Sequence, residues 1–291
     1  MIEIPENSGY YYDINPSEAK IIAKKDNIEI PRCLYKFYPL NENSVNAFVE
    51  QKIYASHPFQ FNDPYDNTRF LMRGAGVSDD LYQLFYSMNG ILCLTDPQNW
   101  NSLLMWGLYC NNEGYSILFD YKKFRFKTEG PFPLNYQEGI LSEDYFTKKN
   151  ISNQYIIFYL MTLKNKLWKH EKEYRLILSK DKQMNAPKID GFSFSERLED
   201  RFFAYSKEAI LEVNLGYYFI FNSDCVINEG HSLIIKTYDF KRISILTKII
   251  SDNYKSYIMR PALNLFELQR DEVKIVRIDQ NSFKFLYCDK R

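Results

Sequence analysis

The sequence has few of the features that mark secreted, zinc-binding or membrane proteins. Its 291 residues include only five cysteines, which are scattered and form no CxxC pair. This argues against a disulfide framework and against a zinc knuckle, and it favours a reducing cytoplasm. Residues 1–12 contain no apolar segment of the signal-peptide kind, and no apolar run reaches the length of a membrane span. We therefore expect a cytoplasmic protein with no membrane partner.

An excess of charge of either sign is also absent. The formal net charge is +0, from 37 basic and 37 acidic side chains, so we expect no global attraction to nucleic acid or anionic lipid. The strongest local basic run is formed by Lys164, Lys166, Lys169 and Lys172. A run with this spacing is usually the solvated face of a helix, which is our interpretation here. A nucleic-acid-binding face, with tyrosines as a stacking platform, is the alternative.

The common catalytic signatures are missing as well. The sequence has no glycine-rich phosphate loop, no HExxH and no G-x-S-x-G. His57, His170 and His231 lie far apart in the chain, so we expect no metal site. If the protein is an enzyme, its chemistry must depend on carboxylates, aromatic rings and hydrogen bonds.

What the sequence does contain is typical of a globular α+β protein. Hydrophobic residues make up 45%, charged residues 25% and aromatic residues 17%. Apolar runs bounded by Gly, Pro or Asn predict strands at 33–37, 53–56, 91–95, 115–120, 134–136, 173–179 and 210–214. Helical spacing with cap residues predicts helices at 43–51, 78–88, 101–110 and 143–169, with a short one at 16–24.

The uneven alternation of these elements indicates a single domain with a mixed, mostly antiparallel sheet flanked by helices. Residues 1–30 are interpreted as an irregular lead-in, 31–220 as the core domain, and 221–291 as an extension packed on the core.

Two glutamates at the start of a predicted strand form the most suggestive local pattern. Alternate residues of a strand share a face, so Glu171 and Glu173 are expected to point the same way. Two like charges this close raise one pKa or require a cationic or hydroxyl partner. The simpler alternative is that one glutamate pairs with Arg175 while the other faces water.

Two other features have simple structural explanations. Asn62-Asp63-Pro64 is typical of a turn, and Trp106 on an apolar helix is usually part of the core.

Several of these segments together resemble a known family. LYKF at 34–37, IYAS at 53–56 and FNDPYD at 61–66 resemble the opening signature of the bacterial domain-of-unknown-function family numbered 2971. ILCLT at 91–95, with LMW at 104–106 and residues 114–120, resembles its middle signature. Trp168 with KEYR at 172–175 resembles its third. The resemblance extends over residues 32–216, with the motifs in order.

The order of these motifs is in turn similar to that of the ADP-ribosyltransferase superfamily, which implies a core of that type acting on NAD. By that analogy Lys36 takes a first-strand position where the superfamily has His, Tyr or Arg, and Ser56 or Thr95 supplies a hydroxyl. Glu173 would be the catalytic acid, and Glu171 would complete the pair. The residues that the resemblance and the pattern assign to NAD binding are Tyr35, Lys36, Ser56, Asn62, Asp63, Thr95, Trp106, Tyr174 and Arg175.

Two functions follow as hypotheses. The first is an NAD-dependent ADP-ribosyltransferase or NAD glycohydrolase in toxin or phage-defence service, with NAD as substrate. The acceptor, whether protein or nucleic acid, stays open. The second is a non-catalytic module that binds a nucleotide or a protein. It predicts that Glu171 and Glu173 are both engaged by Arg175 or by lysines. The oligomeric state is not predicted.

Overall fold

The chain forms two compact units, each built from three segments of the sequence. The computed structural model describes residues 1–15, 20–179 and 198–288. Unit 1 comprises Met1–Ile30, Tyr54–Leu94 and Phe126–Phe203, and unit 2 comprises Pro31–Ile53, Thr95–Arg125 and Ala204–Arg291. The division into lead-in, core domain and extension stays a prediction.

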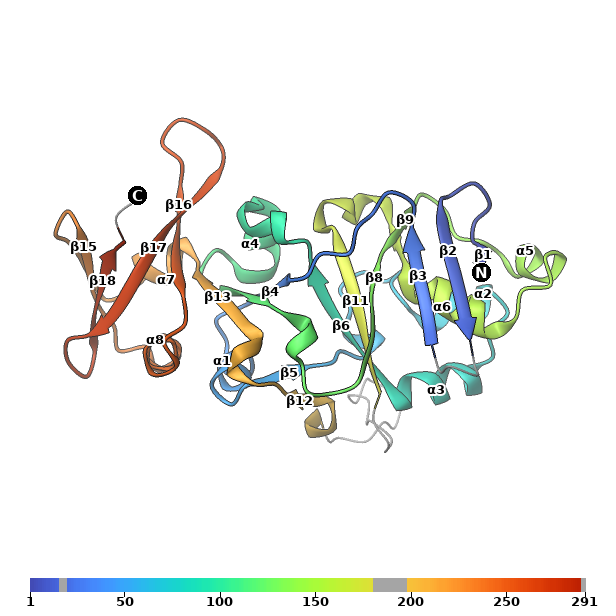
Figure 1. Cartoon of the computed structure of the whole chain (residues 1–291), viewed down its shortest axis with the longest axis horizontal. Coiled ribbons are helices and arrows are strands. Elements are labelled where there is room, and N and C mark those ends of the chain that lie inside the picture. The colour runs from blue at the N-terminus through green and yellow to red at the C-terminus, as the bar shows by residue number, and fades with distance from the viewer. Residues whose placement is uncertain (16–19, 180–197, 289–291) are drawn as a thin grey trace. The chain divides into compact units, whose positions relative to one another are not determined.

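In its described residues, unit 1 combines short strands with α-helices (Figure 1). Its strands are β1 (Ile2–Glu3), β2 (Tyr10–Asn15), β3 (Lys20–Lys25), β6 (Asn89–Thr95, whose last residue falls in unit 2), β8 (Thr128–Pro133), β9 (Asn135–Gln137), β10 (Leu163–Asn165) and β11 (Glu173–Ser179). Its helices are α2 (Arg69–Gly74), α3 (Asp79–Met88), α5 (Glu143–Lys148) and α6 (Asn153–Thr162), with 3₁₀ turns η1 (Pro58–Gln60), η4 (Lys166–Glu171) and η5 (Leu198–Arg201).

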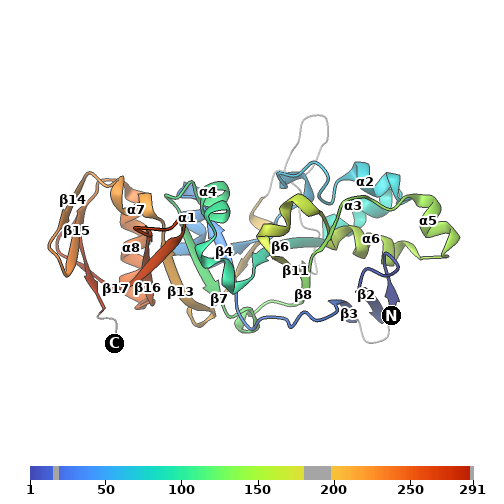
Figure 2. The ribbon, with the colours of Figure 1, turned by 90° about the horizontal axis from the view of Figure 1, so that it is seen from above.

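The core of unit 1 surrounds α6, which is apolar on every side. The helix contacts α2 and β2 (Figure 2). Its residues 156–162 are all buried, and Thr162 Oγ1 lies 2.9 Å from the hydroxyl of Tyr12 on β2. A helix that is hydrophobic all round must be covered on all sides, which explains why β2 and α2 both contact it.

Unit 2 contains a large, mostly antiparallel sheet with helices against it. Its strands lie in the order β14 (Cys225–Asn228), β15 (Ser232–Lys236), β18 (Ser282–Tyr287), β17 (Leu268–Arg277), β16 (Ser256–Pro261), β13 (Ile210–Leu215), β7 (Tyr115–Phe119) and β4 (Leu34–Tyr38). The β13–β16 pair is parallel, and the other registers within the unit are antiparallel. The helices are α1 (Glu42–Val49), α4 (Leu103–Cys110), α7 (Tyr217–Phe221) and α8 (Phe240–Asp252), with 3₁₀ turns η2 (Pro97–Asn101), η3 (Tyr121–Lys123) and η6 (Lys207–Ala209).

Two short strands, β5 (Lys52–Tyr54) and β12 (Phe202–Ala204), lie where the chain passes from one unit to the other. The predicted α+β class, with a mostly antiparallel sheet flanked by helices, is confirmed.

Local signals explain many of the element boundaries. Asn41 and Ser44 form a capping box at α1, and Ser78 caps α3 through a hydrogen bond from the backbone of Leu81. Helix α4 begins after Ser102 and ends at Asn111, whose φ of 50° is left-handed.

Two predicted helices are wrong, and so is the irregular conformation expected for the described part of residues 1–30. Residues 143–169 do not form one helix. Asn150, with a φ of 51°, separates α5 from α6, and at Leu163 the chain leaves the helix to pair in parallel with β9. The short helix predicted at 16–24 is also absent from the described residues. Residues 16–19 lie outside them, and β3 begins at Lys20. Residues 1–30 are not irregular, since β1, β2 and β3 form an antiparallel sheet.

Candidate functional site

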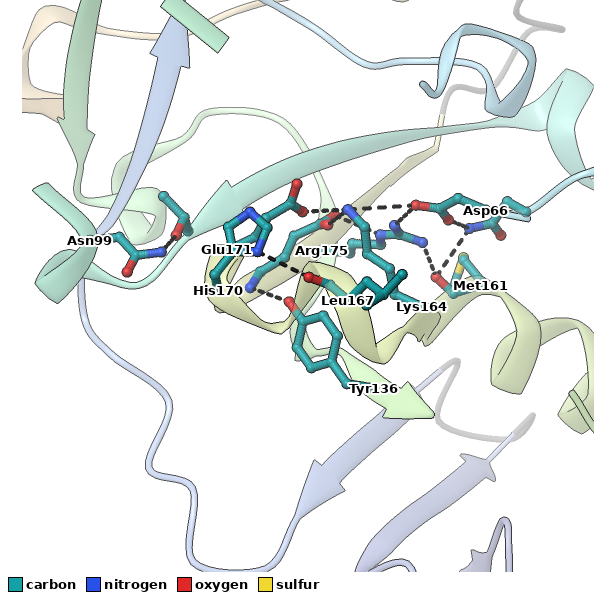
Figure 3. Close-up of polar contacts among 12 residues, drawn as sticks. Asp66, Asn99, Tyr136, Met161, Lys164, Leu167, His170, Glu171 and Arg175 are labelled. Atoms are coloured by element: carbon teal, nitrogen blue, oxygen red, sulfur yellow. Dashed lines mark hydrogen bonds and ion pairs between the residues drawn. The ribbon is translucent and has the colours of Figure 1, made fainter. Parts of the chain in front are cut away.

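A group of charged side chains meets inside unit 1, and Figure 3 labels Asp66, Lys164, Glu171 and Arg175 among them. They come from four places in the chain, and they are Asp66, Lys164, Glu171, Glu173 and Arg175. Each of these side chains is at most 5% exposed. Burying an ion costs several kcal/mol unless it is paired and hydrogen-bonded, so the pairing inside this ion cluster is needed to offset the cost of burying it.

Lys164 links the two glutamates. It lies on β10, and its ammonium donates to Oε2 of Glu171 and to Oε2 of Glu173, the latter at 2.6 Å. Asp66 Oδ2 lies 3.8 Å from the same Nζ. The cation therefore neutralises part of the charge of three carboxylates.

Arg175 is the second cation of the ion cluster, and its donors point in three directions. Nε donates to Glu173 Oε1 at 2.8 Å, one terminal nitrogen donates to Asp66 Oδ2 at 2.5 Å, and the other donates to the backbone carbonyl of Met161 at 2.6 Å. The ring of Phe61 lies 5.2 Å from the guanidinium carbon, within the range of a cation–π contact. The planar fork of Arg is suited to holding two carboxylates and a carbonyl at fixed angles.

The hydrogen-bond network continues beyond the charged groups. Asn67 donates to Asp66 Oδ1 at 2.8 Å, and the hydroxyl of Tyr86 donates to Asn67 Oδ1 at 2.5 Å. The backbone N–H of Glu173 donates to the hydroxyl of Tyr136 at 2.8 Å. These neutral partners fix the orientation of Asp66 and the start of β11.

Burial and ion pairing act in opposite directions on the pKa values. Burial lowers the pKa of Lys164, but Glu173 and Glu171 outweigh it and raise the pKa overall. Burial raises the pKa of Glu173, but Arg175 and Lys164 outweigh it and leave the pKa below its ordinary value. Both groups are therefore charged at neutral pH.

The two glutamates reach Lys164 by a route that the sequence did not predict. Glu171 ends the 3₁₀ turn η4, Lys172 has a left-handed φ of 45°, and β11 begins only at Glu173. They are not alternate residues of one strand. Their carboxylates nevertheless meet at one ammonium, with the left-handed Lys172 between them.

A cavity of about 170 Å³ adjoins this ion cluster at β10. It is lined by Tyr65, Gln137, Glu138, Gly139, Ile140, Leu163, Lys164 and Asn165. Drug-sized ligands occupy about 300–1,000 Å³, so this cavity has room for one ring or one sugar rather than for a whole dinucleotide.

Other residues assigned to the site in unit 1 lie in ordinary structural contexts. Ser56 forms an isolated bridge with Ile91. Asn62 is exposed, and Asp63 accepts a hydrogen bond from the backbone of Tyr65 at 2.9 Å, as in an Asx turn. Buried Tyr174 faces Pro133 in the β11–β8 register.

The remaining assigned residues belong to unit 2. The hydroxyl of Tyr35 donates to Glu212 and accepts from Arg270 at 2.9 Å. The three other residues make separate contacts: Lys36 lies 5.7 Å from the ring of Tyr38, Thr95 accepts from Asn99 at 2.8 Å, and Trp106 meets Phe37 edge to face at 5.2 Å. Of the assigned residues, the ion cluster brings together Glu171, Glu173 and Arg175.

Two members of the ion cluster were missed. The sequence analysis placed Lys164 on a solvated helix face, which is wrong, because Lys164 is 5% exposed. The other lysines of that run, Lys166, Lys169 and Lys172, are exposed. Lys164 directly follows the apolar run at 155–163, and this position was a sequence signal for its burial. Asp66 closes the FNDPYD motif but was not singled out as a site residue.

In the described ranges, no group of three His, Cys, Asp or Glu side chains is arranged to hold a metal ion. Nor does any helix among the residues that the structure describes have the length and apolar character needed to cross a membrane.

Comparison with protein families gives a match over part of the chain. Residues 105–176 match the model of a family described as "Protein of unknown function (DUF2971)". This segment is similar to that family. The match covers less than half of the chain, and it includes four of the five charged residues, Lys164, Glu171, Glu173 and Arg175. It supports the family resemblance noted in the sequence. No curated protein and no solved structure matches the chain.

Proposed function

We propose that unit 1 is a binding module for a nucleotide-type ligand and that it does not cleave this ligand. One observation carries the proposal. Glu171 and Glu173 are already bound by Lys164, and Glu173 is also bound by Arg175. The side chains of the two glutamates are 3% and 4% exposed. A carboxylate that bonds a ribose hydroxyl during glycosidic cleavage must face the substrate. Here both carboxylates are used to hold the ion cluster together.

The cavity beside Lys164 provides the place for one ring or one sugar of the ligand, and the rest of the ligand would lie outside it. Its walls offer the amides of Gln137 and Asn165 and the hydroxyl of Tyr65, groups that bond a base edge or a sugar hydroxyl. The ion cluster keeps β10 in place, and β10 contributes three residues to the wall. In this proposal, binding specificity depends on neutral hydrogen-bonding groups, and the ion cluster supplies rigidity.

Two glycines allow a direct test. A Cβ at Gly139, in the cavity wall, or at Gly74, at the end of α2, has no neighbour within 4 Å. The Cβ of Gly139→Val therefore has room at the cavity wall, where we expect the valine to narrow the cavity, and Gly74→Val is the matched control. Thermal unfolding with NAD, ADP-ribose, AMP or ATP is the measurement. A ligand at a hundredfold excess over Kd stabilises the wild type by about 2.7 kcal/mol.

We expect Gly139→Val to lose the ligand-induced shift and Gly74→Val to keep it. The absence of a shift with all four nucleotides, or a shift that survives in Gly139→Val, contradicts the proposal.

NAD cleavage is the second candidate, and it has an observation of its own. The carboxylates of Glu171 and Glu173 converge on one positive charge, the ammonium of Lys164. An oxocarbenium-like ribosyl group needs the same negative environment. In such a step the glycosidic C–N bond breaks, its electron pair leaves with nicotinamide, and water or another hydroxyl adds to the ribose carbon and loses a proton. The toxin or phage-defence role belongs to this candidate.

Nicotinamide release distinguishes the two candidates. The wild type is incubated with NAD, and the products are separated by chromatography. The binding proposal predicts no release above the buffer control. Release by the wild type that Glu173→Gln reduces at least about hundredfold overturns the binding proposal in favour of cleavage.

We also propose that the protein acts in the cytoplasm. None of its five cysteines, all of which lie among the described residues, forms a disulfide. This is the usual state in a reducing compartment.

A further inference from the structure

Two side-chain amides of the cavity beside Lys164 belong to residues that lie opposite each other. Gln137 on β9 and Asn165 on β10 are partners in the parallel register of the two strands, and both line the cavity. Neighbouring strands are about 4.7–4.9 Å apart, so the two amides are close enough to bind the same small polar group. Which atom each amide presents decides what the cavity recognises.

The orientation of the Gln137 amide follows from a chain of hydrogen bonds that starts at a backbone carbonyl. Asn135 Nδ2 donates to the carbonyl of Ile4 at 3.2 Å, so the other polar atom of the Asn135 amide is the oxygen. Gln137 lies 2.6 Å from that oxygen and must donate to it through Nε2. The atom of the Gln137 amide that remains is Oε1, an acceptor.

The Asn165 amide is fixed in the opposite sense. A backbone N–H can only donate, and that of Leu167 lies 2.9 Å from the Asn165 side chain, which therefore accepts through Oδ1. The atom that remains is Nδ2, a donor. Among the described residues, neither Gln137 Oε1 nor Asn165 Nδ2 has a partner, and neither atom is fully shielded from solvent. The pair therefore presents one acceptor and one donor.

The charges beside the cavity disfavour an anion. Lys164 reaches the lining from the ion cluster, in which two cations, Lys164 and Arg175, face three carboxylates. One negative charge is left over, and the ammonium of Lys164 already donates to two of the carboxylates. A phosphate or carboxylate that entered the cavity would meet this surplus charge and the lone pairs of Gln137 Oε1.

We propose that the cavity selects an uncharged, amide-like edge of a ring, in which a donor lies beside an acceptor, and that the phosphates of the ligand stay outside. This inference rests on the proposed function and specifies which part of the nucleotide is bound. A carboxamide on a pyridine ring has such an edge, with its NH₂ for Gln137 Oε1 and its carbonyl for Asn165 Nδ2. The amino group and N1 of adenine form the same pattern. Leu163 and Ile140 add apolar surface for the ring.

Two pairs of nucleotides, each differing in one group, test the inference by calorimetric titration. NAD is compared with its nicotinic acid analogue, in which a carboxylate replaces the carboxamide, and AMP with purine riboside monophosphate, which lacks the amino group. We expect at least one pair to differ by about tenfold or more in Kd, because the change leaves a polar group of the cavity unpaired or opposes two acceptors. The pair that differs identifies the bound ring.

The same titrations separate failure of this inference from failure of the proposed function. Equal Kd values within both pairs, the result expected for a bound sugar, overturn the inference and leave the proposed function intact. No binding of any nucleotide overturns the proposed function and this inference with it.

Asn165→Asp is the matched change in the protein. Aspartate keeps an oxygen that accepts from Leu167 and replaces Nδ2 by a second acceptor. We expect it to weaken binding of the preferred nucleotide by about tenfold or more. The control is Asn41→Asp, because the Asn41 side chain also accepts from a backbone N–H, that of Ser44, but lies in unit 2. It should bind the nucleotide as the wild type does.

Far-UV circular dichroism shows that each variant is folded. Asn165→Ser, which keeps an accepting oxygen and removes the amide, serves as a second variant if Asn165→Asp does not fold. A folded Asn165 variant that binds the nucleotide as tightly as the wild type overturns the inference, and so does an equal loss of binding in Asn41→Asp.

Discussion

The ammonium of Lys164 donates a 2.6 Å hydrogen bond to Oε2 of Glu173, and the two side chains are 5% and 4% exposed. A second lysine–glutamate pair lies close to it in sequence. Lys166 and Glu138 are 2.7 Å apart, with side chains 56% and 79% exposed. Both pairs join a lysine to a glutamate, but one lysine is buried among three carboxylates and the other is exposed with one.

Removing each lysine should give very different losses of stability. Lys164→Met leaves Glu171 and Glu173 buried with one cation fewer, and this should lower the free energy of unfolding by roughly 3–5 kcal/mol. Lys166→Met removes an exposed pair and should cost less than about 1 kcal/mol. Urea unfolding at neutral pH gives both values. Equal losses would mean that the buried ions are not coupled as the structure describes.

The sequence contained enough information to predict the local parts of this arrangement. The strands at 34–38 and 115–119 are bounded by Pro39 and Gly114, which punctuate the chain, and they form where they were expected. Glu171, Glu173 and Arg175 lie within five residues of one another, and their proximity needed no knowledge of the fold.

The parts that were missed depend on contacts between distant segments. Nothing local ends α6 at Thr162. The helix ends because Leu163 pairs with Asn135 of β9. The same pairing turns Lys164 inward, whereas helical spacing of the lysines had placed it in solvent. Asp66 reaches Arg175 across 109 residues of sequence, and no periodicity encodes such a contact.

The low pKa of Glu173 makes stability depend on pH. Because the folded carboxyl has a pKa below its ordinary value of 4.5, the unfolded chain takes up a proton first as the pH falls. The stabilisation is therefore complete above the unfolded pKa, and it is lost progressively from about pH 5 downward, until the pH passes the lower pKa of the folded carboxyl. Glu173→Gln should be less stable than the wild type at pH 7, and its stability should decline less steeply over this window.

The control is Glu138→Gln, because the exposed Glu138 is screened by solvent. Urea unfolding across the window is the measurement, and a wild-type slope that persists in Glu173→Gln would contradict the assignment.

His57 should give a separate pH dependence at higher pH. Burial, followed by the charge of Arg201, lowers its pKa from 6.5 to about 3. Below about pH 6.5 the unfolded chain binds a proton at His57 that the folded chain does not bind. The free energy of unfolding therefore falls as the pH drops from about 6.5 toward 3. The slope approaches about 1.4 kcal/mol per pH unit. Between about pH 6 and 5, above the titration of Glu173, His57→Gln should flatten the slope and the exposed His231→Gln should not. An unchanged slope in His57→Gln would show that another group titrates.

Substituting alanine for two glycines of unit 2, Gly114 and Gly107, should change the free energy of unfolding in opposite directions. A Cβ on Gly114 would lie 2.0 Å from the backbone oxygen of Tyr38, so the turn between α4 and β7 must shift to accept it. Strain of this kind costs roughly 1–3 kcal/mol, and Gly114→Ala should be destabilised by about that amount.

Gly107 lies inside α4, with nothing within 4 Å of an added Cβ. Gly107→Ala should gain about 0.5–1 kcal/mol, because alanine loses less backbone entropy in a helix. Urea unfolding of both variants decides the matter. If Gly114→Ala were as stable as the wild type, β4 and the turn before β7 could not approach as closely as described.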